Sequence, residues 1–161
     1  MKKYSISISE SVDESFWDYE LCKNESSTIY QSYNWSLIYR NTYESKPIFF
    51  LIRDSSNKIV AQLMAFIHSK YFWGNANNTI QKIASMFNLG SILFWWYGPI
   101  IHDLENKDEI LDFLFNEIYQ FSLKNKLIMI QGSFPPSPAY HEKSILEKSG
   151  YTIIPWSTYI V

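Results

Sequence analysis

Two β-rich segments joined by a short polar turn constrain this fold more than any other feature of the sequence. Residues 47–54 read PIFFLIRD and residues 58–71 read KIVAQLMAFIHSKY, and both are rich in the branched and aromatic residues that strands favour. Ser55, Ser56 and Asn57 lie between them and are typical of a turn. The sequence therefore predicts an antiparallel hairpin with a long second strand.

Three further segments predict strands. Residues 4–9 alternate between apolar residues and serine, the period of a strand with one buried face. Residues 91–101 (SILFWWYGPII) are an uncharged apolar run that is ended or bulged at Gly98 and Pro99, because proline cannot donate to a strand ladder. Residues 127–133 form a short apolar strand before a stiff, proline-rich loop.

Helical patterns separate these strands. The predicted helices cover residues 15–23, residues 33–43 with Ser32 as cap, residues 107–124, and residues 139–148 before a left-handed C-cap at Gly150. The third is the clearest, with a core stripe of Ile110, Leu114, Ile118 and Phe121. Residues 73–90 mix an asparagine-rich loop signal with helical spacing, and predict a loop that encloses a short helix.

Residues 151–161 predict a broken strand or strand pair, interrupted at Pro155. Because the chain stops within an apolar strand, this strand is either tucked centrally into the sheet, part of a longer architecture, or simply the end of a small domain. The whole order predicts an α/β fold with a mixed antiparallel and parallel sheet and helices on both faces. At 161 residues, of which 47% are hydrophobic, we expect a single domain over residues 1–161.

Charge and cysteine content narrow the function. The net charge is −2, and Arg40 and Arg53 are the two arginines, so the chain lacks the basic footprint of a duplex-binding protein and we expect no DNA partner. Cys22 is the single cysteine and the N-terminus lacks the apolar core of a signal peptide, so we expect a cytoplasmic protein. The apolar run at 91–101 is about half of the ~20 residues that cross a bilayer, so no membrane span is expected.

Glycine is scarce while aromatic rings are abundant. The chain has 5 Gly against 11 Phe, 12 Tyr and 6 Trp. Phosphate-binding loops need glycine because their backbone must approach an anion closely. The composition therefore counts against the usual kinds of nucleotide-binding enzyme.

The element order is similar to that of the GNAT acyltransferase fold, and local segments sharpen the likeness. Residues 30–35 (YQSYNW) resemble the QS-x-x-W segment that opens the second helix of Fem-type proteins, the aminoacyltransferases that build peptidoglycan cross-bridges. Further segments look like the first GNAT-like domain of that family: KIVA at 58–61, YGPI at 97–100, LEKSGY at 146–151 and TY at 158–159. Their order and spacing carry the resemblance, which covers nearly the whole chain.

The resemblance implies transfer of an acyl or aminoacyl group to an amine acceptor, with aminoacyl-tRNA as donor. Fem-type proteins pair two GNAT-like domains and hold substrate at or near the cleft between them. This chain corresponds to the first domain, so a second GNAT-like domain or a homodimer partner is expected to complete the site. A tRNA partner follows from the resemblance alone.

Ordinary GNAT enzymes bind the acetyl-CoA pyrophosphate on a Q/R-x-x-G-x-G/A loop between a central strand and the next helix. Here that junction, residues 97–107, reads YGPIIHDLENK, with one glycine, a proline that removes an amide donor, and the acidic Asp103 and Glu105. We therefore expect no acetyl-CoA in the usual pocket and no other cofactor. GNAT proteins hold the acyl donor in a V-shaped gap between the strands equivalent to 93–97 and 127–131, so pairing of these strands would argue for loss of that activity.

The candidate substrate contacts are Gln31, Ser32, Tyr33, Trp35, Tyr97, Gly98, Gln131 and Ser133. Rings on the 33–43 helix either line a groove for an acyl or nucleotide group or pack in the core. The strand end around Gln131 is where an open α/β sheet receives ligand, or else a polar cap for the next helix. Trp95 and Trp96 are adjacent on a strand, so they are expected to face opposite sides.

No catalytic residue and no metal ligand is assigned. His68, His102 and His141 lie on different elements at spacings that match no common metal signature, and no Gly-x-Ser-x-Gly elbow is present. Two alternatives to the Fem-like reading stay open. One is a non-catalytic interaction domain that uses an aromatic surface, and the other is a small-molecule N-acetyltransferase with a degenerate CoA loop.

Overall fold

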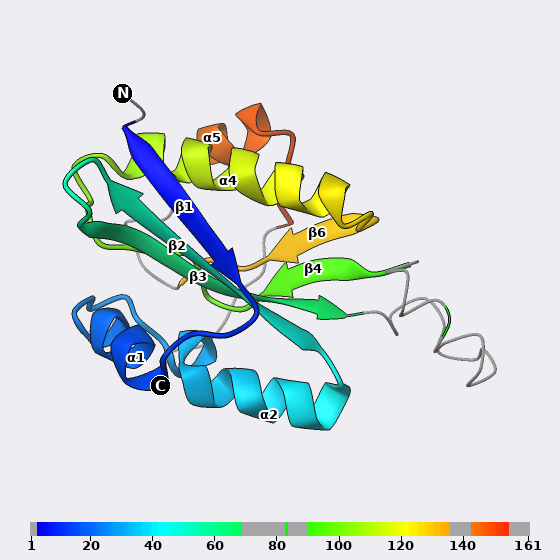
Figure 1. The fold of residues 1–161 in the computed structure, drawn as a ribbon. Helices are drawn as coiled ribbons and strands as arrows, with labels where there is room; N and C mark the ends of the chain where they lie inside the picture. Colours follow the sequence, from blue (N-terminus) through cyan, green and yellow to red (C-terminus); the bar gives the residue numbers. More distant parts are fainter. Residues whose placement is uncertain (1–2, 69–82, 84–89, 136–142, 155–161) are drawn as a thin grey trace.

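In the computed structural model, a mixed sheet lies between helices on both of its faces (Figure 1). The structure describes residues 3–68, 83, 90–135 and 143–154. The strands are β1 (Tyr4–Ser9), β2 (Lys46–Asp54), β3 (Ile59–His68), β4 (Ile92–Trp95), β5 (Ile100–Ile101) and β6 (Met129–Gly132). The helices are α1 (Glu14–Cys22), the 3-10 turn η1 (Ile29–Gln31), α2 (Tyr33–Tyr43), α4 (Lys107–Lys124) and α5 (Lys143–Lys148). Helices α1 and α2 cover one face, and α4 and α5 the other.

The strand order is β1-β2-β3-β4-β6. Strand β5 also pairs with β3, along a part of β3 that β4 does not reach. The β4–β6 pair is parallel, and the other pairs of this sheet are antiparallel. This arrangement confirms the predicted mixed α/β fold. The hairpin of β2 and β3 is confirmed too: the Asp54 carboxylate accepts hydrogen bonds from the amides of Ser56 (2.8 Å) and Lys58 (2.9 Å), which closes the turn.

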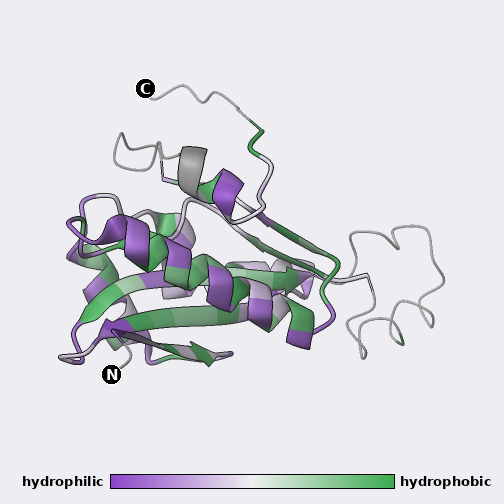
Figure 2. Cartoon of the chain, turned by 90° about the horizontal axis from the view of Figure 1, so that it is seen from above, coloured by the Kyte–Doolittle hydropathy of each residue, from purple (hydrophilic) through white to green (hydrophobic). Residues whose placement is uncertain are grey.

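Local sequence signals account for the helix boundaries. Ser32 caps α2 as predicted, since its hydroxyl oxygen accepts a hydrogen bond from the amide of Trp35 at 3.3 Å. Asp13 caps α1 through the amide of Phe16 at 2.8 Å. Helix α4 has the predicted bounds, and its colouring alternates between hydrophilic and hydrophobic along the helix, as expected of an amphipathic helix (Figure 2).

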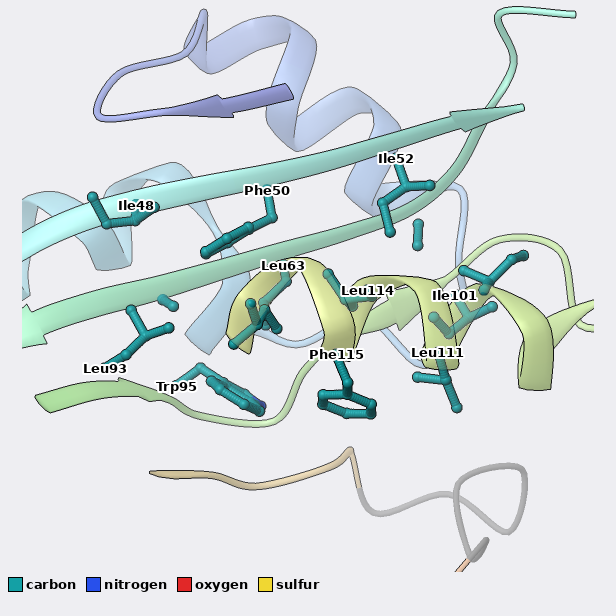
Figure 3. Close-up of a cluster of buried hydrophobic side chains, with 14 of the residues drawn as sticks. Ile48, Phe50, Ile52, Leu63, Leu93, Trp95, Ile101, Leu111, Leu114 and Phe115 are labelled. Atoms are coloured by element: carbon teal, nitrogen blue, oxygen red, sulfur yellow. The ribbon is translucent and has the colours of Figure 1, made fainter. Parts of the chain in front are cut away.

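The main core lies between the sheet and α4 (Figure 3). Of the predicted α4 stripe, Ile110, Leu114 and Ile118 are buried there, and Phe121 packs at its margin. A second cluster lies under α1 and α2 and contains Trp17, Phe49, Leu51, Ile59, Met64 and Phe66. Strands β2 and β3 are buried along nearly their whole length because helices cover both faces.

Several predicted segments differ in detail. Residues 91–101 are two strands, β4 and β5, separated by a bulge at the predicted Gly98–Pro99 position. Residues 151–154 are not in a strand, which corrects the prediction for that segment, and Gly150 has the expected left-handed φ of 81°. The predictions for 157–161, for 139–142 of the last helix and for most of 73–90 lie outside the described residues, as does His141. Within the described part, no helix is long and apolar enough to cross a membrane.

Candidate functional site at the break between β4 and β5

The candidate site is built around the break between β4 and β5. Strand β3 pairs with β4 at Phe66 and Phe94, and with β5 at Gln62 and Ile100. Three residues of β3, 63–65, therefore lie opposite five residues, 95–99, of the neighbouring chain. We call residues 96–99 the β4 bulge. Its second residue, Tyr97, has a left-handed φ of 46°, and a cis peptide joins Gly98 to Pro99.

The Gln31 side chain fills the space that the bulge opens beside β3. Its Nε2 donates to the carbonyls of Met64 (3.1 Å) and Trp96 (2.7 Å), and its Oε1 accepts from the Met64 amide at 2.7 Å. Gln31 is fully buried. The Gln31 side chain therefore forms hydrogen bonds with the amide and carbonyl of Met64, which have no partner strand at the interruption between β4 and β5.

Glycine is required at position 98 for this arrangement. A Cβ on Gly98 would lie 2.8 Å from Nε2 of Gln31 and 2.7 Å from Cδ1 of Leu63. Both distances are shorter than a Cβ atom tolerates from a packed, non-bonded heavy atom. The glycine of the YGPI segment and the glutamine of the QS-x-x-W segment are therefore spatial neighbours.

Ser133 forms hydrogen bonds with the backbone of the bulge on the side that faces β6. Its hydroxyl oxygen accepts from the Tyr97 amide at 2.9 Å, and its carbonyl accepts from the Gly98 amide at 2.9 Å. Its own amide donates to the Trp95 carbonyl at 3.3 Å. The strands β4 and β6, which pair from Ile92 to Trp95, therefore stay bonded through the bulge.

The Trp95 ring fills the space over β6. A Cβ built on Gly132 would fall 1.9 Å from Cε2 of Trp95, so the ring lies directly against the glycine backbone. The indole Nε1 donates to the Gly98 carbonyl at 2.9 Å, and the side chain is only 3% exposed. Figure 3 shows this ring beside Phe115 of α4. The space between β4 and β6 on this face is occupied by tryptophan.

Aromatic rings gather on the opposite side of the bulge, toward α2. We call this group the aromatic patch; it consists of Tyr30, Trp35, Tyr39, Tyr43, Phe94, Trp96 and Tyr97. Successive ring centroids lie 4.6 to 6.4 Å apart. Trp96 is 38% exposed and Tyr43 is 49% exposed, so part of the patch faces solvent. As expected for adjacent strand residues, Trp95 and Trp96 face opposite sides.

The start of α4 already holds a carboxylate. Asp103 accepts hydrogen bonds from the backbone amide of Asn106 (3.3 Å) and from its side chain (2.9 Å). Asp108 and Glu109 lie in the first turn, and Glu109 forms an ion pair with Lys3. The helix start therefore carries two basic residues, Lys3 and Lys107, beside these carboxylates, and Asp103 is the acidic group that already occupies an amide there.

His102 lies at the end of β5, on the α1 side of the sheet. Its Nε2 lies 3.1 Å from Oε1 of the buried Gln62, whose Nε2 donates to the Trp17 carbonyl at 3.4 Å. That orientation of Gln62 places the ring hydrogen on Nε2 of His102. Burial lowers the pKa of His102, as do the charges of Lys23 and Lys58, while Glu20 opposes the shift.

Two cavities of about 290 and 650 Å³ lie at another part of the sheet, and both are lined by Glu10 and Lys46, which form an ion pair. Neither is lined by a predicted contact residue. Among the described residues, no group of three or more His, Cys, Asp or Glu is placed to hold a metal ion.

Solved structures with a similar fold identify the architecture. The aminoglycoside antibiotic 6'-N-acetyltransferase AAC(6')-Ih of Acinetobacter baumannii matches with a TM-score of 0.55 at 11% identity, over 98% of this chain and 97% of that one. A structure described as a probable acetyltransferase matches with a TM-score of 0.59 at 10% identity, over 98% and 96%. The fold is that of the GNAT acetyltransferases.

A third GNAT-fold match is described as a possible acetyltransferase from Clostridium difficile 630, with a TM-score of 0.53 at 13% identity, over 99% of this chain and 97% of that one. No protein-family model matches the sequence, and no curated protein matches it. The likeness is therefore one of fold, and these neighbours lend no support to the narrower Fem-type assignment. Strands β4 and β6, which the resemblance to GNAT proteins makes the expected frame of a donor gap, are paired here from Ile92 to Trp95.

The structure brings four predicted contact residues together at the bulge: Gln31, Tyr97, Gly98 and Ser133. Trp35 joins the aromatic patch. Ser32 caps α2, and Tyr33 stacks on Phe49 at 6.2 Å, away from the bulge. Gln131 is exposed and lies opposite Phe94 in the β4–β6 pair.

Sequence reasoning did not foresee the part that two residues play here. Met64 supplies the backbone groups that Gln31 binds, and the Tyr30 ring packs against that of Tyr97 with centroids 4.8 Å apart. Tyr30 stands directly before Gln31 in the YQSYNW segment, so its position was a usable signal. Met64 carries no such signal, since only its backbone takes part.

Proposed function

We propose that this chain is a GNAT-fold acyltransferase that transfers an acyl group to an amine and does not use acyl-CoA as donor. The fold supports acyl transfer in general, because its structural neighbours are described as acetyltransferases. The finer form of the proposal is an aminoacyl donor of the kind that the Fem-type resemblance implies. An aminoacyl-tRNA ester supplies such a group without a CoA moiety.

The proposal that acyl-CoA is not the donor depends on the contacts that join β4 and β6. Trp95 lies over Gly132, and Ser133 bonds the amides of Tyr97 and Gly98. A donor that enters between these strands has to displace a buried indole and break these hydrogen bonds. The donor is therefore expected on the α2 side of the bulge, where the aromatic patch is partly exposed.

The carboxylate of Asp103, just before α4, supports the same conclusion. Asp103 already caps the amide of Asn106, and its charge opposes a pyrophosphate at that position. The site proposed here needs no anion-binding loop. It needs the amine and the acyl carbonyl to be held close together, because such positioning lowers the barrier to acyl transfer.

The transfer itself is an attack of the amine nitrogen on the acyl carbonyl. A C–N bond forms, the bond to the leaving oxygen breaks, and the amine proton passes to that oxygen. Trp35, Tyr97 and Gln131 are the predicted contacts that lie toward the α2 side, and we expect them to hold the reactants. The negative charge that develops on the carbonyl oxygen requires a donor nearby.

The deciding experiment compares two donors on the full chain. A peptide that carries a lysine amine is incubated with radiolabelled aminoacyl-tRNA or with radiolabelled acetyl-CoA, and label in the peptide is counted against reactions without protein. Label from aminoacyl-tRNA alone is the expected result. Label from acetyl-CoA overturns the donor proposal and favours the small-molecule N-acetyltransferase reading. Label from neither donor, across the same protein concentrations as are used for sedimentation, overturns the enzyme proposal.

The exposed part of the aromatic patch favours a second candidate, a non-catalytic interaction domain. Trp96 and Tyr43 are 38% and 49% exposed, so this part of the patch is open to contact with a second copy or with a second GNAT-like domain. Sedimentation of the wild-type chain and of a Trp96→Ala, Tyr43→Ala variant tests the first of these partners. A concentration-dependent dimer that the variant loses supports this candidate, and a monomer in both counts against self-association.

A further inference from the structure

We infer that Gln31 is the positioning residue of the proposed site: its side-chain amide stands in for a strand backbone and directs Trp96 and Tyr97 toward α2. The inference rests on the proposed function in so far as it places acyl transfer at the β4 bulge. The arrangement of the bulge itself is independent of that proposal.

The first step is the replacement of a strand ladder by a side chain. Antiparallel neighbours exchange amide and carbonyl bonds, and Met64 has both groups bonded to the Gln31 amide instead. The remaining Nε2 hydrogen reaches the Trp96 carbonyl at 2.7 Å. Both amide hydrogens are thus used within the protein, and neither is left for a ligand.

The second step concerns the direction of two consecutive rings. Along a regular strand, Trp96 and Tyr97 would face opposite sides of the sheet. Here Trp96 Nε1 donates to the Tyr39 hydroxyl of α2 at 3.3 Å, and the Tyr97 ring lies 4.8 Å from that of Tyr30. Both rings therefore face the α1–α2 side, and the left-handed Tyr97 backbone makes this possible.

The third step is that Gln31 is itself held in place. Its backbone carbonyl accepts a hydrogen bond from the Trp17 indole at 2.7 Å, and the Trp17 carbonyl accepts from Gln62 at 3.4 Å. Gly98 leaves room for the amide on the far side. A buried residue fixed by a chain of hydrogen bonds and touching the bulge backbone has the properties of a positioning residue.

The test follows the resonances of the bulge in Gln31→Glu, Gln31→Leu and the control Gln120→Leu, in which an exposed glutamine of α4 is changed. In Gln31→Glu, the protonated carboxyl group donates one hydrogen bond to the Trp96 carbonyl and accepts from the Met64 amide, whereas the ionised carboxylate repels both carbonyls. We expect the Trp96 and Tyr97 amide peaks and the Trp96 indole peak of Gln31→Glu to be native-like at low pH. They should shift as pH rises.

The other two variants serve as a loss-of-contact comparison and as a control. In Gln31→Leu the same peaks should be displaced at every pH, and in Gln120→Leu they should stay in place. Gln31→Glu keeps the test decisive if Gln31→Leu does not fold. Bulge peaks that do not move in Gln31→Glu across the pH range overturn the inference, whatever the activity assays give.

The activity arm separates positioning from substrate contact. With the labelled peptide assay, Gln31→Glu at high pH should lose about 10- to 100-fold in kcat, with recovery at low pH beyond the change that wild type shows. A rise in KM alone, with the bulge peaks in place, identifies Gln31 as a substrate contact and overturns the inference. Absence of transfer in wild type refutes the proposed function, while the resonances still decide whether Gln31 sets the bulge.

Discussion

The indole of Trp95 lies where any side chain on Gly132 would have to be. A Cβ on Gly132 falls 1.9 Å from Cε2 of the ring and 2.3 Å from its Nε1, and that Nε1 bonds the Gly98 carbonyl. The ring and the glycine together join β4 to β6. The resemblance to GNAT proteins implies that this strand pair frames the donor gap, so the donor that we propose depends on this contact.

Gly132→Ala should destabilise the protein by about 2–3 kcal/mol, because the added methyl overlaps a buried ring that is fixed by a hydrogen bond. Urea unfolding measures the free energy of unfolding. Gly150→Ala is the matched glycine control: no atom lies within 4 Å of its Cβ, and only its φ of 81° opposes the change. In a Trp95→Leu background, Gly132→Ala should lower the free energy of unfolding by less than it does in wild type, whereas the effect of Gly150→Ala should stay the same. Equal losses in both backgrounds would contradict the contact.

Trp95→Leu should open space between β4 and β6 and allow acetyl-CoA to bind weakly, whereas wild type should not bind it. The indole fills this space and Leu leaves part of it empty, at a cost of about 2–4 kcal/mol in the free energy of unfolding. Isothermal titration with acetyl-CoA measures the difference. Tyr119→Leu on the exposed side of α4 is the control, since it removes a ring without touching the gap. Binding by wild type as tight as by Trp95→Leu would show that the ring does not block the gap.

Ser133→Ala should speed hydrogen exchange at the Tyr97 amide and leave the Gly98 amide protected. The Tyr97 amide donates to the serine hydroxyl, which the variant lacks, and the Gly98 amide donates to the backbone carbonyl of residue 133, which the variant keeps. The expected loss of stability is about 1 kcal/mol, the usual net value of one hydrogen bond. Two-dimensional NMR resolves the two amides. Equal acceleration at both would mean that the strand pair opens as a unit.

The sequence predicted the elements whose signals are local. The turn at Ser56, the cap at Ser32 and the stripe of α4 depend on residues a few positions apart, and all three are confirmed. The opposite directions of Trp95 and Trp96 follow from strand geometry alone. The break near Gly98 was also predicted, because Pro99 has no amide hydrogen to donate to a strand ladder.

The rest of the site could not be predicted, since it depends on register. Gln31 meets Met64 and Trp96 across 33 and 65 positions of sequence, and nothing local indicates that a side chain will pair with strand backbone. The left-handed conformation of Tyr97 is equally hidden, because bulky residues seldom adopt it. The strand predicted at 151–154 failed for a related reason: apolar composition alone does not say whether a partner strand is in reach.

His102 should titrate below its ordinary pKa of about 6.5, because burial disfavours the charged ring. The folded state then binds fewer protons than the unfolded chain between the two pKa values, so this contribution to stability is present above pH ~6.5 and is lost as pH falls through that window. His102→Asn removes it, and its free energy of unfolding should fall less than that of wild type between about pH 7.5 and about pH 5. Proton NMR of the imidazole gives the pKa directly, with His68→Asn used to assign the second described histidine. A midpoint at or above 6.5, or an equal fall in both proteins, would show that burial does not hold His102 neutral.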